Sequence, residues 1–373
     1  MNPSYRIVFY VSAHGFGHTS RSIEVIHAVL RARPDAHIVI KTSAPRRLFA
    51  RTLEGRCELV ELQGDPGMVQ IDSLHIDTVE SVRRAIEFQA RVPSLVAAEA
   101  AYLRDSGARL VVADIPPLAI AAAHAAGIPS VAIANFTWDW IYDGYDDDGA
   151  REIARQMRQL YATTSIALRL PMAGGFVGLE AVTRDIPFVA RRSSRTQDDV
   201  RVALGLAPRA NGKPLVLMSF GGYGVSGLDT QALAAMKDFT IATTDSPSNN
   251  NVISPTCGLL YLSEQHIYAN GLRYEDLVRG ADIVVTKPGY GIISEAIAND
   301  TALLYTSRGH FVEYGVLVKE MPTYVRAQFI EQEDLLRGNW KGALEKLLSQ
   351  PAPPEKPALN GADIAAAEIL GQG

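Results

Sequence analysis

The sequence "ADIVVTKPGYGIISEAIANDTALLYTS", residues 281–307, contains the pattern that decides the fold. An apolar run ends at a Gly-rich turn, a segment of helical character follows, and a second apolar run comes directly after it. Continuous apolar strands that alternate with helices are typical of a parallel sheet covered on both faces. The segment therefore predicts a strand, a turn and a helix, followed by another strand of the same sheet.

The same alternation extends through the C-terminal half of the chain. Residues 214–220, "PLVLMSF", form a near-continuous apolar run, and residues 237–244, "KDFTIATT", favour a further strand. Residues 311–321, "FVEYGVLVKEM", have helical character. This repetition predicts an α/β domain over residues 214–355.

The N-terminal half predicts a second domain of this kind over residues 1–190. Pro116 and Pro117 suit the first turn of a helix, which Gly127 ends. The predicted strands are apolar runs that lie at residues 6–12, 37–43, 110–114, 129–135 and 165–172. The predicted fold class is therefore α/β, with two doubly wound, Rossmann-like domains.

Two further segments complete the predicted organisation. Residues 191–213 are polar and contain turn residues, which is typical of an exposed linker between domains. Residues 356–373 form a C-terminal tail, which begins in a Pro-rich stretch and ends in a short helix.

Composition limits the classes of function. The chain has 373 residues, 47% hydrophobic and 21% charged, with a net charge of −5, so no global field favours nucleic acid. Two cysteines are too few for a disulfide framework, and we expect a cytoplasmic protein without a secretory signal. The longest apolar region, residues 110–136, contains Asp, His and three Pro residues, which argues against a membrane span.

Three Gly-rich turns follow predicted strands, at residues 12–20, 219–224 and 286–295. Ligands of open α/β sheets bind beyond the carboxyl ends of the strands. Free backbone N–H groups and the helix dipole attract anions such as phosphate at these positions. The turns therefore predict a phosphate-containing ligand, although tight strand–helix packing is an alternative for any single turn.

A dinucleotide site of a dehydrogenase is the first alternative. Residues 15–20, "GFGHTS", approach the required fingerprint, but the second strand ends at Lys41 and Thr42 without the acidic residue that would hold a ribose hydroxyl. No GxxxxGK[ST] phosphate loop occurs in the chain. These features disfavour both a dehydrogenase and a kinase of the P-loop type.

Two histidines in the first turn are candidate general bases. His18 lies at the predicted start of a helix, and Asp114 ends a predicted strand, so the two side chains are expected to meet at one edge of the sheet. His14 is the alternative base. In the third turn, Glu295 beside Ser294 either caps a helix or accepts hydrogen bonds from ribose hydroxyls.

Together these motifs resemble those of GT-B glycosyltransferases, in particular the bacterial peptidoglycan N-acetylglucosaminyltransferase family. The first turn and the "KPGYG" segment also resemble the glycosyltransferase-like N-terminal region of plant L-arabinokinases. The resemblance implies that the two domains face each other across a cleft. It also implies transfer of a hexosyl or pentosyl group from a nucleotide diphosphate sugar, such as a UDP-sugar, to an acceptor hydroxyl, with inversion and without a metal or other cofactor.

The resemblance further implies roles for individual residues. The second domain would bind the donor, the first would bind the acceptor, and the final helix would return to the first domain. The implied donor-binding residues are Gly221, Gly222, Lys287, Gly289, Gly291, Ser294, Glu295, Glu313 and Asn270. The expected acceptor-binding residues are Gly15, Gly17, Asn135, Trp138 and Asp139. Core packing is the alternative for Trp138.

Several alternatives stay open at this point. The acceptor is either a small molecule or lipid-linked. Arg46, Arg47 and Arg51, with Leu48 and Phe49, favour an ordinary solvated helix face, and contact of these residues with a membrane is the alternative. The "DGYDDDG" segment, residues 143–149, favours a solvated acidic turn over a metal site. A nucleotide-sugar-binding protein without transferase activity, or an epimerase of the same fold, are the competing functions.

Overall fold

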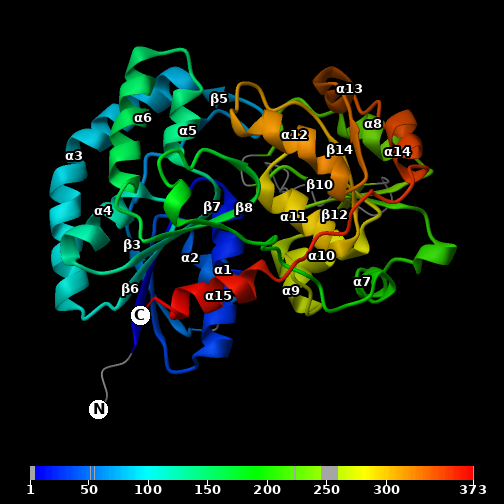
Figure 1. The fold of residues 1–373 in the computed structure, drawn as a ribbon. Coiled ribbons are helices and arrows are strands. Elements are labelled where there is room, and N and C mark those ends of the chain that lie inside the picture. Colours follow the sequence, from blue (N-terminus) through cyan, green and yellow to red (C-terminus); the bar gives the residue numbers. More distant parts are fainter. Residues whose placement is uncertain (1–4, 51, 54, 222–223, 245–258, 373) are drawn as a thin grey trace.

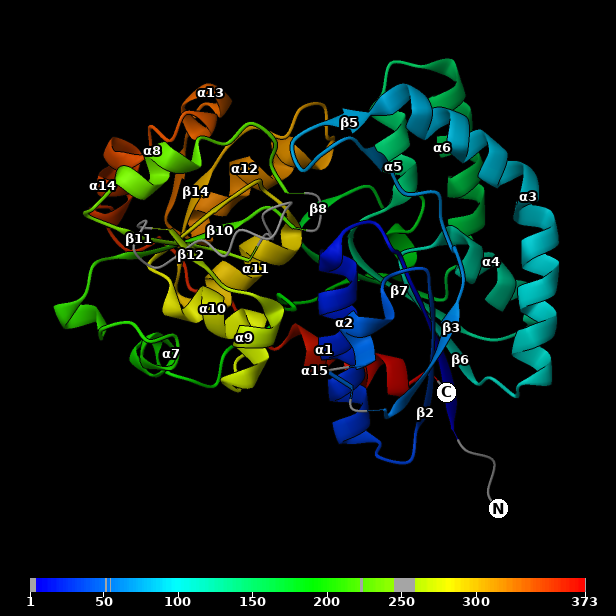
Figure 2. The same ribbon diagram turned by 180° about the vertical axis from the view of Figure 1, so that it is seen from behind.

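A computed structural model describes residues 5–50, 52–53, 55–221, 224–244 and 259–372. Two parallel sheets form the centres of two domains that lie side by side (Figures 1 and 2). This arrangement confirms the predicted α/β class. None of the helices within the described ranges has the length and apolar character needed to cross a bilayer.

The first sheet has the strand order β3-β2-β1-β6-β7-β8-β9, and the second has the order β12-β11-β10-β13-β14-β15. Neighbouring strands in both sheets pair in parallel, as the continuous apolar runs predicted. The first sheet comprises β1 (Arg6–Val11), β2 (His37–Thr42), β3 (Cys57–Glu61), β6 (Leu110–Asp114), β7 (Ser130–Phe136), β8 (Ile166–Gly174) and β9 (Thr183–Asp185). The second comprises β10 (Leu215–Ser219), β11 (Thr240–Thr243), β12 (Leu259–Tyr261), β13 (Ile283–Thr286), β14 (Ala302–Tyr305) and β15 (Ala327–Phe329).

Helices cover both faces of the first sheet. Along β1, Phe9 packs into the core beneath α1, whereas Tyr10 packs into the core beneath α3, so both faces of the strand are buried. A short antiparallel pair, β4 (Val69–Gln70) and β5 (Ile76–Asp77), precedes α3. The helices are α1 (Phe16–Ala32), α2 (Arg46–Ala50), α3 (Thr78–Asp105), α4 (Pro117–Ala126), α5 (Trp138–Asp143) and α6 (Asp148–Tyr161).

The second sheet is covered in the same way. Leu277 of α10 and Ile293 of α11 pack on the face toward the first domain, and Trp340 is fully buried on the other face. The helices are α8 (Thr230–Ala235), α9 (Glu264–Ala269), α10 (Tyr274–Gly280), α11 (Tyr290–Asn299), α12 (Glu313–Tyr324), α13 (Gln332–Leu336) and α14 (Lys341–Leu348).

The segment between the sheets differs from an exposed linker. It contains α7 (Gln197–Ala203), which packs against α10 of the second domain. Arg201 is buried, and its guanidinium lies 3.0 Å from a carboxylate oxygen of Asp282. The polar composition of this segment therefore reflects a buried ion pair as well as exposure to solvent. The tail ends in α15 (Gly361–Leu370), which packs against α1, and the backbone N–H of Gly361 donates to the carbonyl of Phe188 over 3.1 Å.

Each domain sends a loop into the other. Leu74 of the first domain is buried in the core of the second, and the Ser73 hydroxyl donates to the Phe220 carbonyl over 2.6 Å. In the opposite direction, Phe311 of the second domain is buried in the core of the first. These two exchanges bring the carboxyl ends of the two sheets together around the first Gly-rich turn.

Candidate functional site

The first and third Gly-rich turns meet at the domain interface. A Cβ atom added to Gly291 would lie 3.0 Å from the Cα atom of Gly17, so the two backbones touch. Gly17 lies in the first turn of α1, and Gly291 lies in the first turn of α11. The positive ends of two helix dipoles therefore converge on one region, which favours an anion there.

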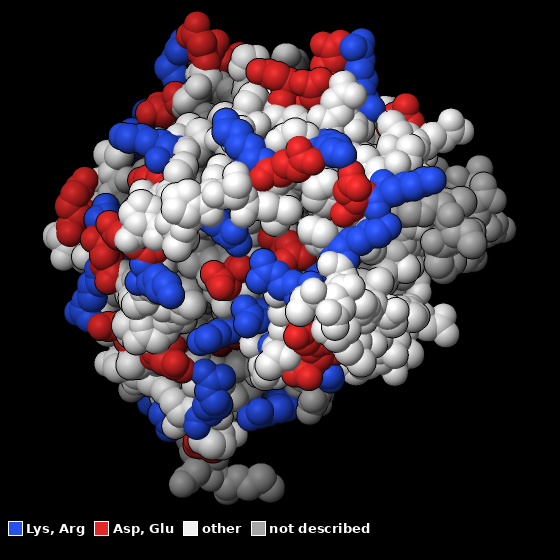
Figure 3. Space-filling model, turned by 90° about the vertical axis from the view of Figure 1, so that its right-hand side faces the viewer, with Lys and Arg blue, Asp and Glu red and all other residues white. Residues whose placement is uncertain are grey.

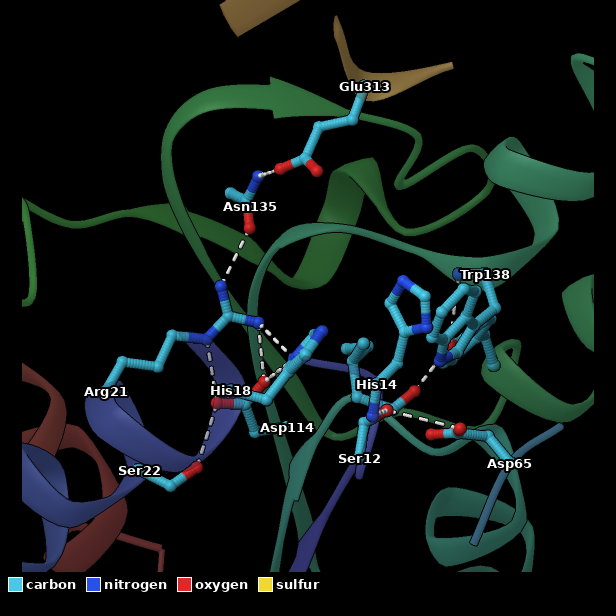
Figure 4. A network of polar contacts seen from close by, with 12 residues as sticks. Ser12, His14, His18, Arg21, Ser22, Asp65, Asp114, Asn135, Trp138 and Glu313 are labelled. Carbon is cyan, nitrogen blue, oxygen red and sulfur yellow. Dashed lines mark hydrogen bonds and ion pairs between the residues drawn. The ribbon is translucent and has the colours of Figure 1, made fainter. Parts of the chain in front are cut away.

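His18 and Asp114 meet as the sequence predicted. The Nδ1 atom of His18 lies 2.7 Å from Oδ1 of Asp114 (Figure 4), and both side chains are buried. β1 and β6 are neighbours in the sheet, so the turn after β1 and the end of β6 lie at the same edge. A carboxylate that accepts the Nδ1 proton leaves the Nε2 lone pair available to accept another.

Arg21 and Ser22 also bind Asp114. Arg21 donates from Nε to Oδ2 over 2.7 Å and from Nη2 to Oδ1 over 2.5 Å, and the Ser22 hydroxyl donates to Oδ2 over 2.9 Å. Burial alone would raise the pKa of Asp114, but the charges of Arg21 and His18 hold it below its ordinary value. Asp114 is therefore a carboxylate at neutral pH, with an oxygen placed to accept a hydrogen bond from Nδ1 of His18.

His14 is less suited than His18 to act as a base. The backbone N–H of Met68 donates to its Nδ1 over 3.2 Å, and Gln70 lies 3.4 Å from its Nε2. Its ring stacks on Phe311 with centroids 5.9 Å apart. Burial, followed by the charge of Arg308, lowers the pKa of His14 well below its ordinary value. The ring is neutral, and the contact of Met68 occupies one of its nitrogens.

Two cations of the second domain lie close to this region without ion pairs among the described residues. Burial, together with nearby Arg308, lowers the pKa of Lys287 to about 7. Burial also lowers the pKa of Arg308, whose guanidinium lies 3.9 Å from the centre of the Phe311 ring. Arg308 is buried and Lys287 is partly buried, and cations that are withdrawn from water without an ion pair favour an anion bound beside them.

Three residues that were predicted to bind the donor or the acceptor have hydrogen-bond partners within the protein. The Asn135 amide donates to Oε1 of Glu313 over 2.6 Å and accepts from Nη1 of Arg21 over 2.7 Å. Asn135 is therefore not an open acceptor ligand, and one oxygen of Glu313 is already occupied. Asp139 is buried and accepts from Nε of Arg158 over 3.0 Å, so it holds α6 in place rather than an acceptor.

Trp138 corresponds to the core alternative. Its side chain is fully buried, and its ring packs 5.3 Å from that of His14 and 6.4 Å from that of His18. It supports both histidines and offers no open face for stacking on a sugar.

The ribose site predicted at Glu295 is closed in this structure. Arg191, which follows the first sheet, donates from Nε to Oε1 of Glu295 over 2.7 Å, and its Nη2 lies 2.5 Å from the same oxygen. Burial nevertheless raises the pKa of Glu295, against the effect of Arg191. The Ser294 hydroxyl donates to the Gly291 carbonyl over 2.9 Å. A ribose would have to displace Arg191 to reach this carboxylate.

The predicted glycines differ in their surroundings. Gly15 has φ +74° and Gly221 has φ +78°, and an added Cβ atom would meet open space at both, as it would at Gly289. A ligand can therefore approach the backbone at these three positions, whereas Gly17 and Gly291 contact each other. Gly222 lies outside the described residues.

A cavity lies beside Asn270, one of the implied donor-binding residues. It has a volume of about 440 Å³ and is lined by Tyr268, Gly271, Leu272 and Arg273. Asn270 is exposed next to this lining, and its amide donates to the His266 carbonyl over 2.8 Å. Tyr274 follows directly and contacts Ser219 through its hydroxyl. Ser219 ends β10, so this contact links the segment beside the cavity to the strand that precedes the second Gly-rich turn.

Sequence reasoning missed Arg21, Arg191 and Arg308 as members of the site. Arg21 and Ser22 follow His18 at helical spacings of three and four residues, which places all three on one face of α1. That spacing was a usable signal. Arg191 and Arg308 lie in irregular segments, and no local pattern identifies their partners.

Comparison with known proteins confirms both resemblances. No family model matches the chain. L-arabinokinase of Arabidopsis thaliana is 31% identical over 370 residues, which cover 96% of this chain and 33% of that protein. The chain therefore spans about a third of the length of this curated relative.

Solved structures share the whole fold. The calicheamicin glycosyltransferase CalG4 has a TM-score of 0.62 at 14% identity and covers 100% of this chain and 96% of its own. MurG of Acinetobacter baumannii has a TM-score of 0.56 at 12% identity, and the match covers 99% of this chain and 100% of MurG. Arabidopsis thaliana UGT89C1 complexed with UDP has a TM-score of 0.57 at 14% identity, and the match covers 98% of this chain and 94% of UGT89C1. The chain has the GT-B fold.

Proposed function

We propose that this protein is a glycosyltransferase that moves a sugar from a nucleotide diphosphate sugar to an acceptor hydroxyl. The observation that carries the proposal is the position of the His18–Asp114 pair at a domain interface. The same interface holds the buried Arg308 and the partly buried Lys287, both without ion pairs among the described residues. A base and an anion site in one place are what sugar transfer from a diphosphate requires.

In the proposed reaction the acceptor oxygen attacks the anomeric carbon, and the bond from that carbon to the diphosphate oxygen breaks. The acceptor proton passes to Nε2 of His18, and Asp114 stabilises the resulting imidazolium. The diphosphate leaves with the bonding electrons, stabilised by Lys287, Arg308 and the start of α11. A single displacement inverts the anomeric carbon, and these groups supply the positive charge that a metal would otherwise provide.

The comparisons support the proposed donor. UGT89C1 was solved with UDP, and we take a UDP-sugar as the first donor to test. The relationship to L-arabinokinase makes a pentosyl donor as reasonable as a hexosyl donor. Because the chain spans only a third of that protein, we do not assign phosphorylation of arabinose to it.

The proposal is tested by incubating the protein with radiolabelled nucleotide sugars and a set of acceptors, then separating the products. The expected result is labelled product from one donor, lost in His18→Ala and retained in His37→Ala, since His37 is exposed and paired with Glu58. Turnover that persists in His18→Ala would refute the assigned base. Failure of every donor to bind would refute the proposal.

A nucleotide-sugar-binding protein without transferase activity is the second candidate. The observation in its favour is that Arg191 and Asn135 already occupy oxygens of Glu295 and Glu313, two residues expected to hold the donor. Saturable binding without transfer or hydrolysis in the same assay would support this function. Isomerised sugar in the absence of acceptor would instead support an epimerase.

A further inference from the structure

A chain of buried polar contacts runs from His18 to the second domain (Figure 4). Arg21 contacts both His18 and Asp114, donates from Nη1 to Asn135, and Asn135 donates to Glu313. Glu313 begins α12 of the second domain, whereas the other four residues belong to the first. The candidate base is thus connected to the other domain through two hydrogen bonds beyond Arg21.

The contacts around Asp114 determine which nitrogen of His18 carries the proton. A carboxylate has about four acceptor positions. Arg21 donates two hydrogen bonds to it and Ser22 donates one, which leaves one position, on Oδ1. His18 Nδ1 lies 2.7 Å from that oxygen. If Nδ1 carries the proton, all four positions are filled and Nε2 keeps the lone pair that a base needs.

The same geometry contains a competing arrangement. Nη2 of Arg21 lies 2.8 Å from Nδ1 of His18, close enough to donate to it. In that arrangement Nδ1 is the acceptor, the proton lies on Nε2, and His18 cannot accept a proton from a substrate. Nδ1 cannot donate to Asp114 and accept from Arg21 at once, so the orientation of Arg21 decides between the two forms.

Residues at the domain interface hold Arg21 in its orientation. Its Nη1 donates a hydrogen bond to the side-chain oxygen of Asn135, and its guanidinium lies 5.5 Å from the centre of the Tyr290 ring of the second domain. The Asn135 amide is in turn oriented by Glu313 over 2.6 Å. Separation of the domains would remove both Glu313 and Tyr290, so that Arg21 would be held only by Asp114 and by an Asn135 amide without its own partner.

We propose that Asn135 is a positioning residue that keeps the proton of His18 on Nδ1 only while Glu313 of the second domain is bound to it. Domain closure would then make His18 competent as a base, so that an open enzyme does not activate water against a bound donor. This inference rests on the proposed function for its consequence in catalysis, but its structural content concerns only the protonation form of His18.

The test is nitrogen NMR on protein labelled with ¹⁵N-histidine, with the His18 signals assigned from a His18→Gln sample. We expect Nδ1 of His18 to be protonated in the unmodified protein. Glu313→Ala, which removes the partner of Asn135, should move the proton to Nε2. Glu313→Gln is the matched control, because its side-chain carbonyl can still accept from Asn135 and should leave the proton on Nδ1.

Asn135→Ala removes the other end of the link and should give the same shift as Glu313→Ala. Circular dichroism and thermal unfolding of each variant establish that it is folded before its spectrum is interpreted. An unchanged His18 form in both alanine variants, or an equal shift in Glu313→Gln, would overturn the proposal. The NMR experiment needs no substrate, so its outcome is independent of whether the protein is a transferase.

Where transfer activity is found, kinetics provide a second readout. Because the base is impaired while the donor site keeps its cations, Asn135→Ala should lower kcat by roughly tenfold to a hundredfold with little change in the donor KM. A change confined to KM would contradict a positioning role.

Discussion

Lys287 predicts that nucleotide binding takes up a proton. Its ordinary pKa of 10.5 is lowered to about 7, first by burial and then by Arg308. At pH 8 only about one molecule in ten therefore carries the charge, by simple titration. A diphosphate bound beside the amine would restore the pKa to well above 9, because an opposite charge at close range favours the charged form.

The magnitude follows from this difference. Binding at pH 8 should take up about 0.9 proton, and binding at pH 7 about 0.5 proton. Because the free protein loses the proton as pH rises while the complex keeps it, the Kd should increase roughly tenfold from pH 8 to pH 9.

Isothermal titration calorimetry with UDP measures the uptake directly, as the dependence of the observed heat on the ionisation enthalpy of the buffer. Lys287→Met should abolish the uptake and weaken binding. Lys319→Met is the matched control, because Lys319 is an exposed lysine of the same domain. Tight UDP binding at pH 8 without proton uptake would refute the placement of the diphosphate beside Lys287.

Three further predictions concern the domain interface. Gly291→Ala should destabilise the protein by about 1–3 kcal/mol in denaturant unfolding, since its Cβ would press on the Gly17 backbone. Gly17→Ala is the control: its Cβ would lie 3.6 Å from Gly291, and stability should change by less than about 1 kcal/mol. Equal effects of the two substitutions would contradict the close contact. Phe311→Ala should lower stability by about 3 kcal/mol, because it empties a buried aromatic position. It should also expand the molecule in X-ray scattering, because Phe311 holds the second domain to the core of the first. Burial and nearby Glu275 raise the pKa of Glu24 from 4.5 to about 7. The folded protein therefore holds this proton more tightly than the unfolded chain, and it loses stability as the pH rises from about 4.5 to about 7. Glu24→Gln should accordingly raise the melting temperature at pH 8 but not below pH 4.5. A pH-independent effect of Glu24→Gln would show that the carboxyl does not titrate as described.

Much of the fold was predictable because buried parallel strands are apolar along their whole length. The contact of His18 with Asp114 was predictable for a related reason: β1 and β6 are adjacent, and their carboxyl ends share one edge of the sheet. Charge composition was informative in the same way. Acidic and basic side chains are interspersed on the face drawn in Figure 3, so this face carries no field of a single sign that would attract nucleic acid.

The contacts that the two domains and the segment between them make with one another were not predictable from the sequence. Arg191 and Glu295 are 104 residues apart, and Asn135 and Glu313 are 178 residues apart. Their pairing depends on how two independently patterned domains dock, and no periodicity or motif records that geometry. The sequence therefore identified Glu295 and Glu313 as important carboxylates but assigned them to a ligand, whereas in this structure each binds a partner within the protein.

The central claim is that a nucleoside diphosphate binds where the two domains meet. A crystal structure of the protein with UDP tests it most directly. We expect the phosphates between Lys287 and Arg308 at the start of α11, with Arg191 released from Glu295 by the ribose. A nucleotide bound elsewhere, with these two cations still without an anion, would contradict the account.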